Sequence, residues 1–256
     1  LELKRHRIKN GIESPLRNSV LLDEFIKYYE SNSKKIKDEK SVKREMLTLK
    51  SFGSYNGYGK RKLATFRTID VHNYVEFRLN YKKADGNHLS PNTVLLDIRN
   101  LKVMFNFGVK YMYIERDPMI GVRGPKPLKK KIRFLTEDEI RDLLQSIDRD
   151  IFRNLIATYL YTGARRDELL PPLFTWESVD FSNKQIILVG KRALVRYVPM
   201  NSTVERILQK HKDEGLEYPF EFTPDHVSYK LADYYRIAGI KDANVHVLRK
   251  TFGSLL

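Results

Sequence analysis

The stretch "TGARRDEL", residues 162–169, joins an apolar segment of the chain to a strongly charged one. The preceding pattern "IFRNLIATYLYTG", residues 151–163, predicts an apolar helix that ends at Gly163. Arg165 follows this glycine turn, and Glu168 comes three residues later. The stretch therefore presents a guanidinium directly after the end of a helix.

Two later stretches add cations close to turns or helix starts. "GKRALVRYVP", residues 190–199, places Lys191 at the bend of a predicted hairpin. "HVLR", residues 246–249, places His246 and Arg249 on one face of a predicted helix. Two arginines, a lysine and a histidine suit a phosphodiester, because two guanidiniums can hold both non-bridging oxygens and stabilise the extra charge of a five-coordinate transition state.

No metal ion or cofactor is expected beside these cations. The chain has no cysteine, which excludes disulfides, thiolate metal sites and a cysteine nucleophile. No carboxylate trio or histidine cluster suggests a metal site, so cations of the protein would have to replace Mg²⁺ at a phosphate.

The net charge of the chain points to an anionic partner. Lys and Arg number 47 against 32 Asp and Glu, which gives a formal charge of +15 spread along the whole sequence. Such a protein attracts polyanions, above all nucleic acid. An anionic membrane surface is the other candidate, but no basic amphipathic helix with Trp and Phe on one side stands out. No apolar run is long enough to span a bilayer, and no signal-peptide pattern opens the chain.

The first half of the chain reads as a small helical domain, residues 19–116, that follows a basic arm, residues 1–18. Its four predicted helices show apolar periodicity or start signals. They cover residues 19–30, 41–53, 68–81 and a segment that opens with Ser90 as the N-cap. Residues 117–133 contain three prolines, two glycines and a cluster of Lys and Arg, which predicts a basic interdomain linker.

The second half, residues 134–256, is predicted to be a mixed α/β domain. Thr136 and Glu139 form a capping box that begins a helix. Two β-rich arms around a basic turn over residues 185–200 predict a hairpin, and helices are predicted over residues 201–215 and 223–239 and around His246 and Arg249. The fold class is therefore mainly α with a small β-sheet.

Each candidate site residue also has an ordinary structural explanation when it is taken alone. Arg165 and Arg166 could form a surface ion-pair network with Asp167 and Glu168. Lys191 could be a solvated hairpin lysine. The ordered combination of all three stretches behind a helical domain favours the phosphodiester hypothesis.

These motifs resemble those of the tyrosine recombinases, the family of phage integrases and Xer-type site-specific recombinases. "TGARRDEL" matches the Thr-Gly-x-Arg-x-x-Glu-Leu box of that family, and "HVLRKTF" matches His-x-Leu-Arg-x-Thr-Phe. "GKRALVRYVPM" resembles the Gly-Lys-Gly hairpin that ends in Arg-x-Val-Pro, and "RFLTEDEIRDLL" resembles the opening of the catalytic domain. The first half is similar to the helical core-binding domain, so the resemblance covers nearly the whole chain.

The resemblance implies a role for each residue of the set. Arg165 and Arg249 would stabilise the transition state, and Lys191 would protonate the leaving 5′-oxygen. His246 would assist proton movement and hold the phosphate, while Glu168 would support the site by orienting neighbouring groups. No metal would take part.

Several positions depart from the family pattern. Trp176 lies eight residues after Glu168 where the family has six, with Pro171 and Pro172 inserted between them. Arg192 replaces the second glycine of the hairpin motif, and Val247 replaces a common Asp. The family places its nucleophilic tyrosine beyond the second arginine, so this residue is not expected among the residues of this chain. The chain alone is therefore expected to be inactive for cleavage.

The implied function is site-specific recombination, in which DNA strands are cut and rejoined through a 3′-phosphotyrosyl intermediate, as in DNA integration by mobile elements. The expected partner is double-stranded DNA, bound by a homotetramer. An accessory DNA-bending protein is a further candidate partner. The expected location is the cytoplasm, on the nucleoid, of a prokaryote or a virus-infected cell. The residues expected to bind DNA are Lys60, Arg61, Lys62, Lys129, Lys130, Lys131 and Arg133. Two alternatives stay open, a type IB topoisomerase-like enzyme and a non-catalytic DNA-binding regulator derived from the recombinase fold.

Overall fold

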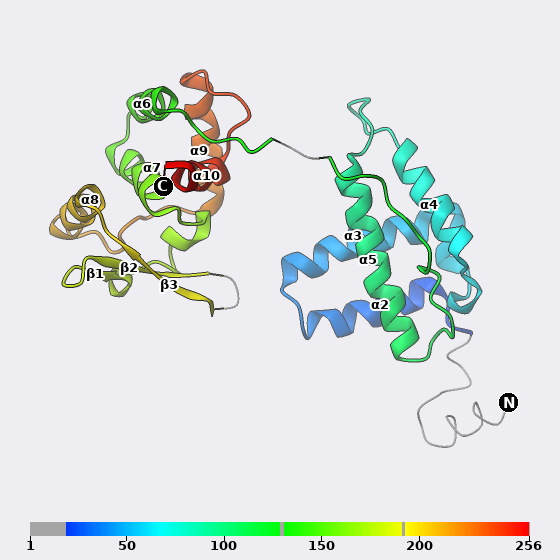
Figure 1. Cartoon of the computed structure of the whole chain (residues 1–256). Coiled ribbons are helices and arrows are strands. Elements are labelled where there is room, and N and C mark those ends of the chain that lie inside the picture. Colours follow the sequence, from blue (N-terminus) through cyan, green and yellow to red (C-terminus); the bar gives the residue numbers. More distant parts are fainter. Residues whose placement is uncertain (1–18, 129–130, 191–192, 256) are drawn as a thin grey trace. The chain divides into compact units, whose positions relative to one another are not determined.

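The computed structural model describes residues 19–128, 131–190 and 193–255 and divides into two compact units, Leu1–Lys129 and Lys130–Leu256 (Figure 1). The first unit is helical. The second combines helices with a small antiparallel sheet. The fold class predicted from the sequence is therefore confirmed.

The first unit contains the four helices that the sequence predicts. They are α2 (Leu22–Lys34), α3 (Glu39–Ser54), α4 (Thr68–Asn80) and α5 (Pro91–Lys110). Short 3₁₀ turns, η2 (Tyr55–Lys60) and η3 (Leu63–Thr65), connect α3 to α4. Helix α5 begins where the sequence indicates, because the Ser90 side chain accepts a hydrogen bond from the Thr93 N–H and Pro91 occupies the first turn.

Aromatic side chains from different helices form the core of the first unit. The Phe52 ring lies edge-on to the rings of Tyr74 and Phe105, and all three residues are buried. Part of the predicted linker also packs here, because Met119 is 6% exposed and joins this core. The predicted domain boundaries stay a prediction.

The second unit is built around α7 (Asp150–Thr162), whose residues are mostly buried. Its other helices are α6 (Glu137–Ser146), α8 (Ser202–Asp213), α9 (Pro224–Ile237) and α10 (Val245–Leu255). Short 3₁₀ turns are η4 (Arg166–Leu169) and η5 (Trp176–Ser178). Figure 1 shows α10 beside α7, and the two helices contact each other.

A three-stranded antiparallel sheet completes the second unit, in the order β1 (Val179–Asp180), β2 (Gln185–Val189) and β3 (Val195–Pro199). The predicted hairpin is β2–β3, with Leu188 opposite Arg196 in the register. Strand β1 was not predicted, because two residues are too short to show an alternating pattern.

One hydrogen bond ties the two ends of the second unit together. The Leu135 N–H donates to the Thr251 hydroxyl of α10 over 2.9 Å, and both residues are buried. The segment that opens this unit is thereby fixed to the helix that carries His246 and Arg249. Among the residues that the structure describes, no helix combines the length and the apolar character needed to cross a bilayer.

Candidate active site

Gly163 produces the turn that ends α7 and aims the chain toward Arg165. Its φ of 58° is left-handed, a conformation that favours glycine, and its N–H bonds the Tyr159 carbonyl oxygen. A Cβ at this position would also come within 2.3 Å of the Phe252 ring of α10. The glycine of "TGARRDEL" is therefore required both by the turn and by the close approach of α10.

Glu168 is the buried centre of the site, with a side chain that is 3% exposed. Its Oε1 accepts a hydrogen bond from Arg165 Nη1 at 2.7 Å, and its Oε2 accepts one from the Arg165 backbone N–H at 2.7 Å. Arg196 of β3 also donates from Nη2 to Glu168 Oε2. A carboxylate with so little contact with water needs such partners, because an unpaired buried charge is strongly destabilising.

Arg249 joins this cluster from α10. Its Nη1 donates to the carbonyl oxygen of Gly163, so the turn that presents Arg165 also holds Arg249. Burial lowers the pKa of Arg249, and the positive charges of Arg196 and Arg165 lower it further. Three guanidiniums are therefore close enough to one another to interact.

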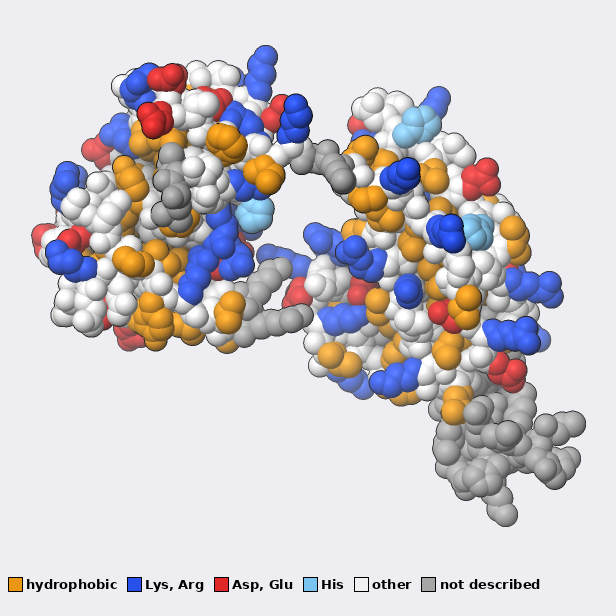
Figure 2. Space-filling view, in the orientation of Figure 1, with side chains coloured by type: hydrophobic (Ala, Val, Ile, Leu, Met, Phe, Trp, Pro, Cys, Tyr) orange, Lys and Arg blue, Asp and Glu red, His pale blue; other side chains and the backbone are white. Residues whose placement is uncertain are grey.

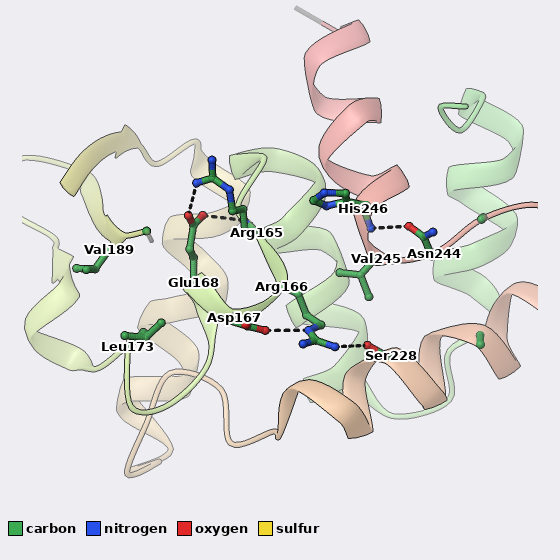
Figure 3. A pocket seen from close by; sticks show the side chains of 13 residues that line it. Arg165, Arg166, Asp167, Glu168, Leu173, Val189, Ser228, Asn244, Val245 and His246 are labelled. Carbon is green, nitrogen blue, oxygen red and sulfur yellow. Dashed lines mark hydrogen bonds and ion pairs between the residues drawn. The ribbon is translucent and has the colours of Figure 1, made fainter. Parts of the chain in front are cut away.

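His246 lies at the start of α10 and lines the same cavity as Arg165 and Glu168. Figure 3 shows Arg165 and Glu168 together on the turn at η4 and His246 on α10, around a cavity of about 490 Å³. The His246 backbone N–H bonds Asn244 Oδ1 at 2.9 Å. Arg166 lines the cavity too, but its guanidinium is already bonded to Asp167 and Ser228.

The hairpin reaches the site through Gly190. A Cβ on this residue would lie 3.1 Å from Glu168 Oε1 and 3.2 Å from Arg165 Nη1, so a larger residue would press on their ion pair. The Gly190 N–H bonds the Leu194 carbonyl oxygen at 2.8 Å, which begins the bend. Lys191, which follows in the sequence, lies outside the described residues.

The structure thus brings together Arg165, Glu168, His246 and Arg249, although their roles in catalysis stay predictions. Sequence reasoning missed Arg196, which contributes the third guanidinium. Two signals could have identified it. Arg196 is the arginine of Arg-x-Val-Pro, and it alternates with exposed residues along β3. An arginine on the inward side of a strand generally needs a carboxylate partner.

The residues predicted to bind DNA occupy different environments. Arg61 pairs with Asp70 at 2.8 Å and lies over the rings of Tyr58 and Phe66. Arg133 pairs with Glu139. The exposed members are Lys60, Lys62 and Lys131, whereas Lys129 and Lys130 lie outside the described residues. Their contact with DNA stays a prediction.

Two tyrosines that precede His246 in the sequence are held away from the cavity. Tyr235 is 2% exposed, and burial raises its pKa. The hydroxyl of Tyr234 donates to Asp148, and this hydrogen bond together with partial burial raises its pKa to about 12. Neither residue lines the cavity of Arg165 and His246. Within the described ranges, no group of three or more His, Asp or Glu side chains could hold a metal ion.

Comparison with known proteins supports the resemblance drawn from the motifs. Residues 21–123 match the family described as the phage integrase SAM-like domain. The tyrosine recombinase XerC of Staphylococcus aureus (strain JH9) is 26% identical over 214 residues, which cover 76% of this chain and 69% of XerC.

Solved structures share the fold. A lambda integrase dimer bound to a COC′ core site has a TM-score of 0.76 at 17% identity, over 98% of this chain and 78% of that one. A lambda integrase tetramer bound to a Holliday junction has a TM-score of 0.74 at 17% identity, over 98% and 81% of the two chains.

Proposed function

Because the chain belongs to the tyrosine recombinase family, we propose that it cuts and rejoins DNA strands at specific sites through a 3′-phosphotyrosyl intermediate. The observation that carries the proposal is the convergence of Arg165, Arg249 and His246 around one buried carboxylate, Glu168, beside an open cavity. No acidic cluster among the described residues supplies a metal in place of these cations.

The two arginines act on the charge of the scissile phosphate. A phosphodiester carries one negative charge, and its oxygens carry nearly two when a fifth oxygen binds phosphorus. Arg165 and Arg249 are fixed in advance by Glu168 and by the Gly163 carbonyl, so they need little reorganisation as this charge develops. Fixed donors of this kind stabilise the transition state more than the bound substrate.

In the cleavage step, one P–O bond forms, another breaks, and two protons are transferred. The hydroxyl oxygen of a tyrosine located after Arg249 in the family order attacks phosphorus, and the P–O5′ bond breaks. The phenolic proton leaves toward His246 or solvent, and Lys191 supplies a proton to the 5′-oxygen. The phosphotyrosine ester conserves the energy of the phosphodiester, so rejoining by the 5′-hydroxyl needs no ATP.

The expected partner is double-stranded DNA, bound by four copies of the protein. The solved lambda integrase assemblies on DNA, which share this fold, support both parts of the proposal. The charge of +15 supports binding to DNA on the nucleoid. An accessory DNA-bending protein would set the geometry of the recombination site.

A covalent-adduct assay tests the proposal. The full-length protein that contains this chain is incubated with a nicked suicide duplex, and the products are separated on a denaturing gel. We expect a band of protein linked to the 3′ end of the cut strand, while the released fragment carries a free 5′-hydroxyl. The chain of residues 1–256 should bind the same duplex with a log–log salt slope of about −0.9 per neutralised phosphate, without forming the band.

Three outcomes would contradict the proposal. Absence of the band with full-length protein would indicate a DNA-binding regulator. Relaxation of supercoiled DNA by a monomer, without synapsed complexes, would indicate a topoisomerase. A covalent band formed by residues 1–256 that disappears in Tyr234→Phe or Tyr235→Phe would place the nucleophile before Arg249.

A further inference from the structure

Arg196 is the one member of the guanidinium cluster without an assigned role. It lies on β3 opposite Leu188, and its Nη2 donates to Glu168 Oε2. Its side chain is 28% exposed, compared with 45% for that of Arg165. Arg165 lines the cavity, whereas Arg196 is not among the residues that line it.

Arg196 limits how Glu168 can bind Arg165. The two carboxylate oxygens are divided, because Oε1 accepts from the Arg165 guanidinium while Oε2 accepts from Arg196 and from the Arg165 backbone. Without Arg196, Oε2 would keep only the bond from the Arg165 backbone N–H and could also attract the Arg165 guanidinium into a two-oxygen pair. Arg165 would then offer fewer N–H groups to a phosphate.

Arg196 also sets the charge of the cluster. Among the described residues, Glu168 pairs with Arg165 and Arg196, and Arg249 interacts electrostatically with all three. One carboxylate against three guanidiniums leaves two positive charges in excess. Burial is the largest cause of the lowered pKa of Arg249, and the positive charge of Arg196 is the next. A transition state that gains negative charge is stabilised by such an excess even without direct contact.

We infer that Arg196 is a positioning residue for the phosphate site: it occupies Glu168 Oε2, leaves Arg165 available to the phosphate, and preserves the positive excess of the cluster. This inference rests on the proposed function. The residue acts through Glu168 and through its charge, and it does not bind the phosphate itself.

Single-turnover cleavage by the full-length protein tests the inference. Arg196→Gln should slow cleavage roughly 10- to 100-fold, as expected for loss of a unit charge several ångströms from the reacting atoms at an effective dielectric constant of about 20. The DNA dissociation constant should change less than about threefold, with the same salt slope. Arg196→Lys retains the charge and should recover most of the rate. Arg141→Gln is the matched control, because Arg141 is an exposed arginine paired with Asp138 on α6, and it should cleave normally.

A double variant separates this role from a structural one. In Glu168→Gln/Arg196→Gln, loss of the carboxylate restores two positive charges, from Arg165 and Arg249. Its cleavage should therefore be faster than that of Arg196→Gln, by less than the charge alone predicts, because Arg165 also loses the carboxylate that fixes it. The loss of cleavage rate in Arg196→Gln should also be smaller on a methylphosphonate substrate, whose transition state carries one negative charge fewer. A purely structural defect would not depend on the charge of the substrate.

A second readout does not require cleavage. Inorganic sulfate should bind residues 1–256 more weakly in Arg196→Gln than in the wild type, and the double variant should regain the affinity. If the wild-type full-length protein forms no covalent adduct, the proposed function fails. The order of sulfate affinities among the wild type, Arg196→Gln and the double variant still tests the inference. The inference is overturned by equal penalties on the charged and neutral substrates. It is also overturned by a parallel loss of DNA affinity and salt slope, which would indicate direct phosphate contact.

Discussion

The two units pair arginines with buried carboxylates in different ways. In the first unit, Arg78 donates from Nε to Asp97 Oδ2 at 2.8 Å, and Asp97 also accepts from the Thr48 hydroxyl at 2.7 Å. In the second unit, Arg165 and Arg196 both bond Glu168, and Arg249 lies close enough to interact with this group. The first arrangement matches one cation to one carboxylate, and the second leaves cations in excess beside a cavity.

This difference separates structural arginines from candidates for substrate binding. A matched pair such as Arg78 and Asp97 satisfies both partners within the protein, and their side chains are 16% and 6% exposed. An excess of positive charge is destabilising until an anion arrives. Figure 2 shows Lys and Arg side chains spread over the visible faces of both units, with one group of them beside a histidine on the second.

Removal of one arginine of each kind should have different effects on the protein. Arg249→Ala should slow cleavage by the full-length protein about a thousandfold, or ~3–4 kcal/mol, with little loss of DNA affinity. Arg165→Ala should behave alike. Arg78→Gln should instead leave Asp97 buried with one partner fewer and lower the unfolding free energy of the first unit by about 3 kcal/mol.

The single tryptophan lets the two units be followed separately. Trp176 lies in the second unit, where its indole N–H bonds the Leu216 carbonyl oxygen, so its fluorescence reports on unfolding of that unit. Arg78→Gln should shift the circular dichroism transition without shifting the fluorescence transition, and its folded protein should cleave at the normal rate. If Arg249→Ala lost binding and cleavage equally, or lost less than about tenfold in rate, Arg249 would belong with the structural arginines.

Much of this arrangement could be predicted from the sequence, because it depends on local signals. The Ser90 cap placed the start of α5, and the glycine turn placed Arg165 after α7. Local signals could indicate that Arg196 faces inward on β3, but they could not identify its partner Glu168, which is 28 residues away in the chain. The pairing of Arg61 with Asp70 likewise depends on how the turn after α3 packs against α4. Local patterns located the cations, and only tertiary contacts showed which ones are neutralised.

A smaller effect is expected from glycines that share a left-handed backbone but differ in their neighbours. At Gly57 of the first unit, φ is +69° and a Cβ would meet nothing within 4 Å. Gly57→Ala should therefore cost only the strain of this conformation, about 1–2 kcal/mol. Gly163→Ala adds overpacking against Phe252, roughly 1–3 kcal/mol more, and should shift the carbonyl that holds Arg249.

Denaturant unfolding measures the stability of the two glycine variants, and single-turnover assays measure their cleavage rates. Gly57→Ala should lower stability alone, whereas Gly163→Ala should lower stability and the cleavage rate together. Combining Gly163→Ala with Phe252→Ala should show a coupling, because removing the ring relieves the contact and leaves the backbone strain. Equal stability losses for the two glycine variants, with an unchanged cleavage rate, would show that the Phe252 contact plays no part in positioning Arg249.

The smallest expected effect is the pH dependence of the matched pair between Arg61 and Asp70. Burial alone would raise the pKa of Asp70, but the hydrogen bonds from the Arg61 side chain and the Arg67 backbone outweigh it and lower the pKa below 3.8. The folded protein therefore binds this proton less readily than the unfolded chain. The stabilisation is fully present above the ordinary pKa of 3.8 and is lost as pH falls through the lower folded value.

Because Arg61 is 34% exposed, solvent screening limits this contribution to about 1 kcal/mol. Circular dichroism unfolding of the first unit between about pH 5 and pH 2 should show the loss, and Asp70→Asn should flatten it. Arg61→Gln should flatten it as well, since Arg61 makes the strongest of the interactions that lower the pKa. If the pH dependence of stability is unchanged in both variants, other carboxylates produce the acid sensitivity. Arg61 could then bind DNA without loss of a stabilising pair with Asp70.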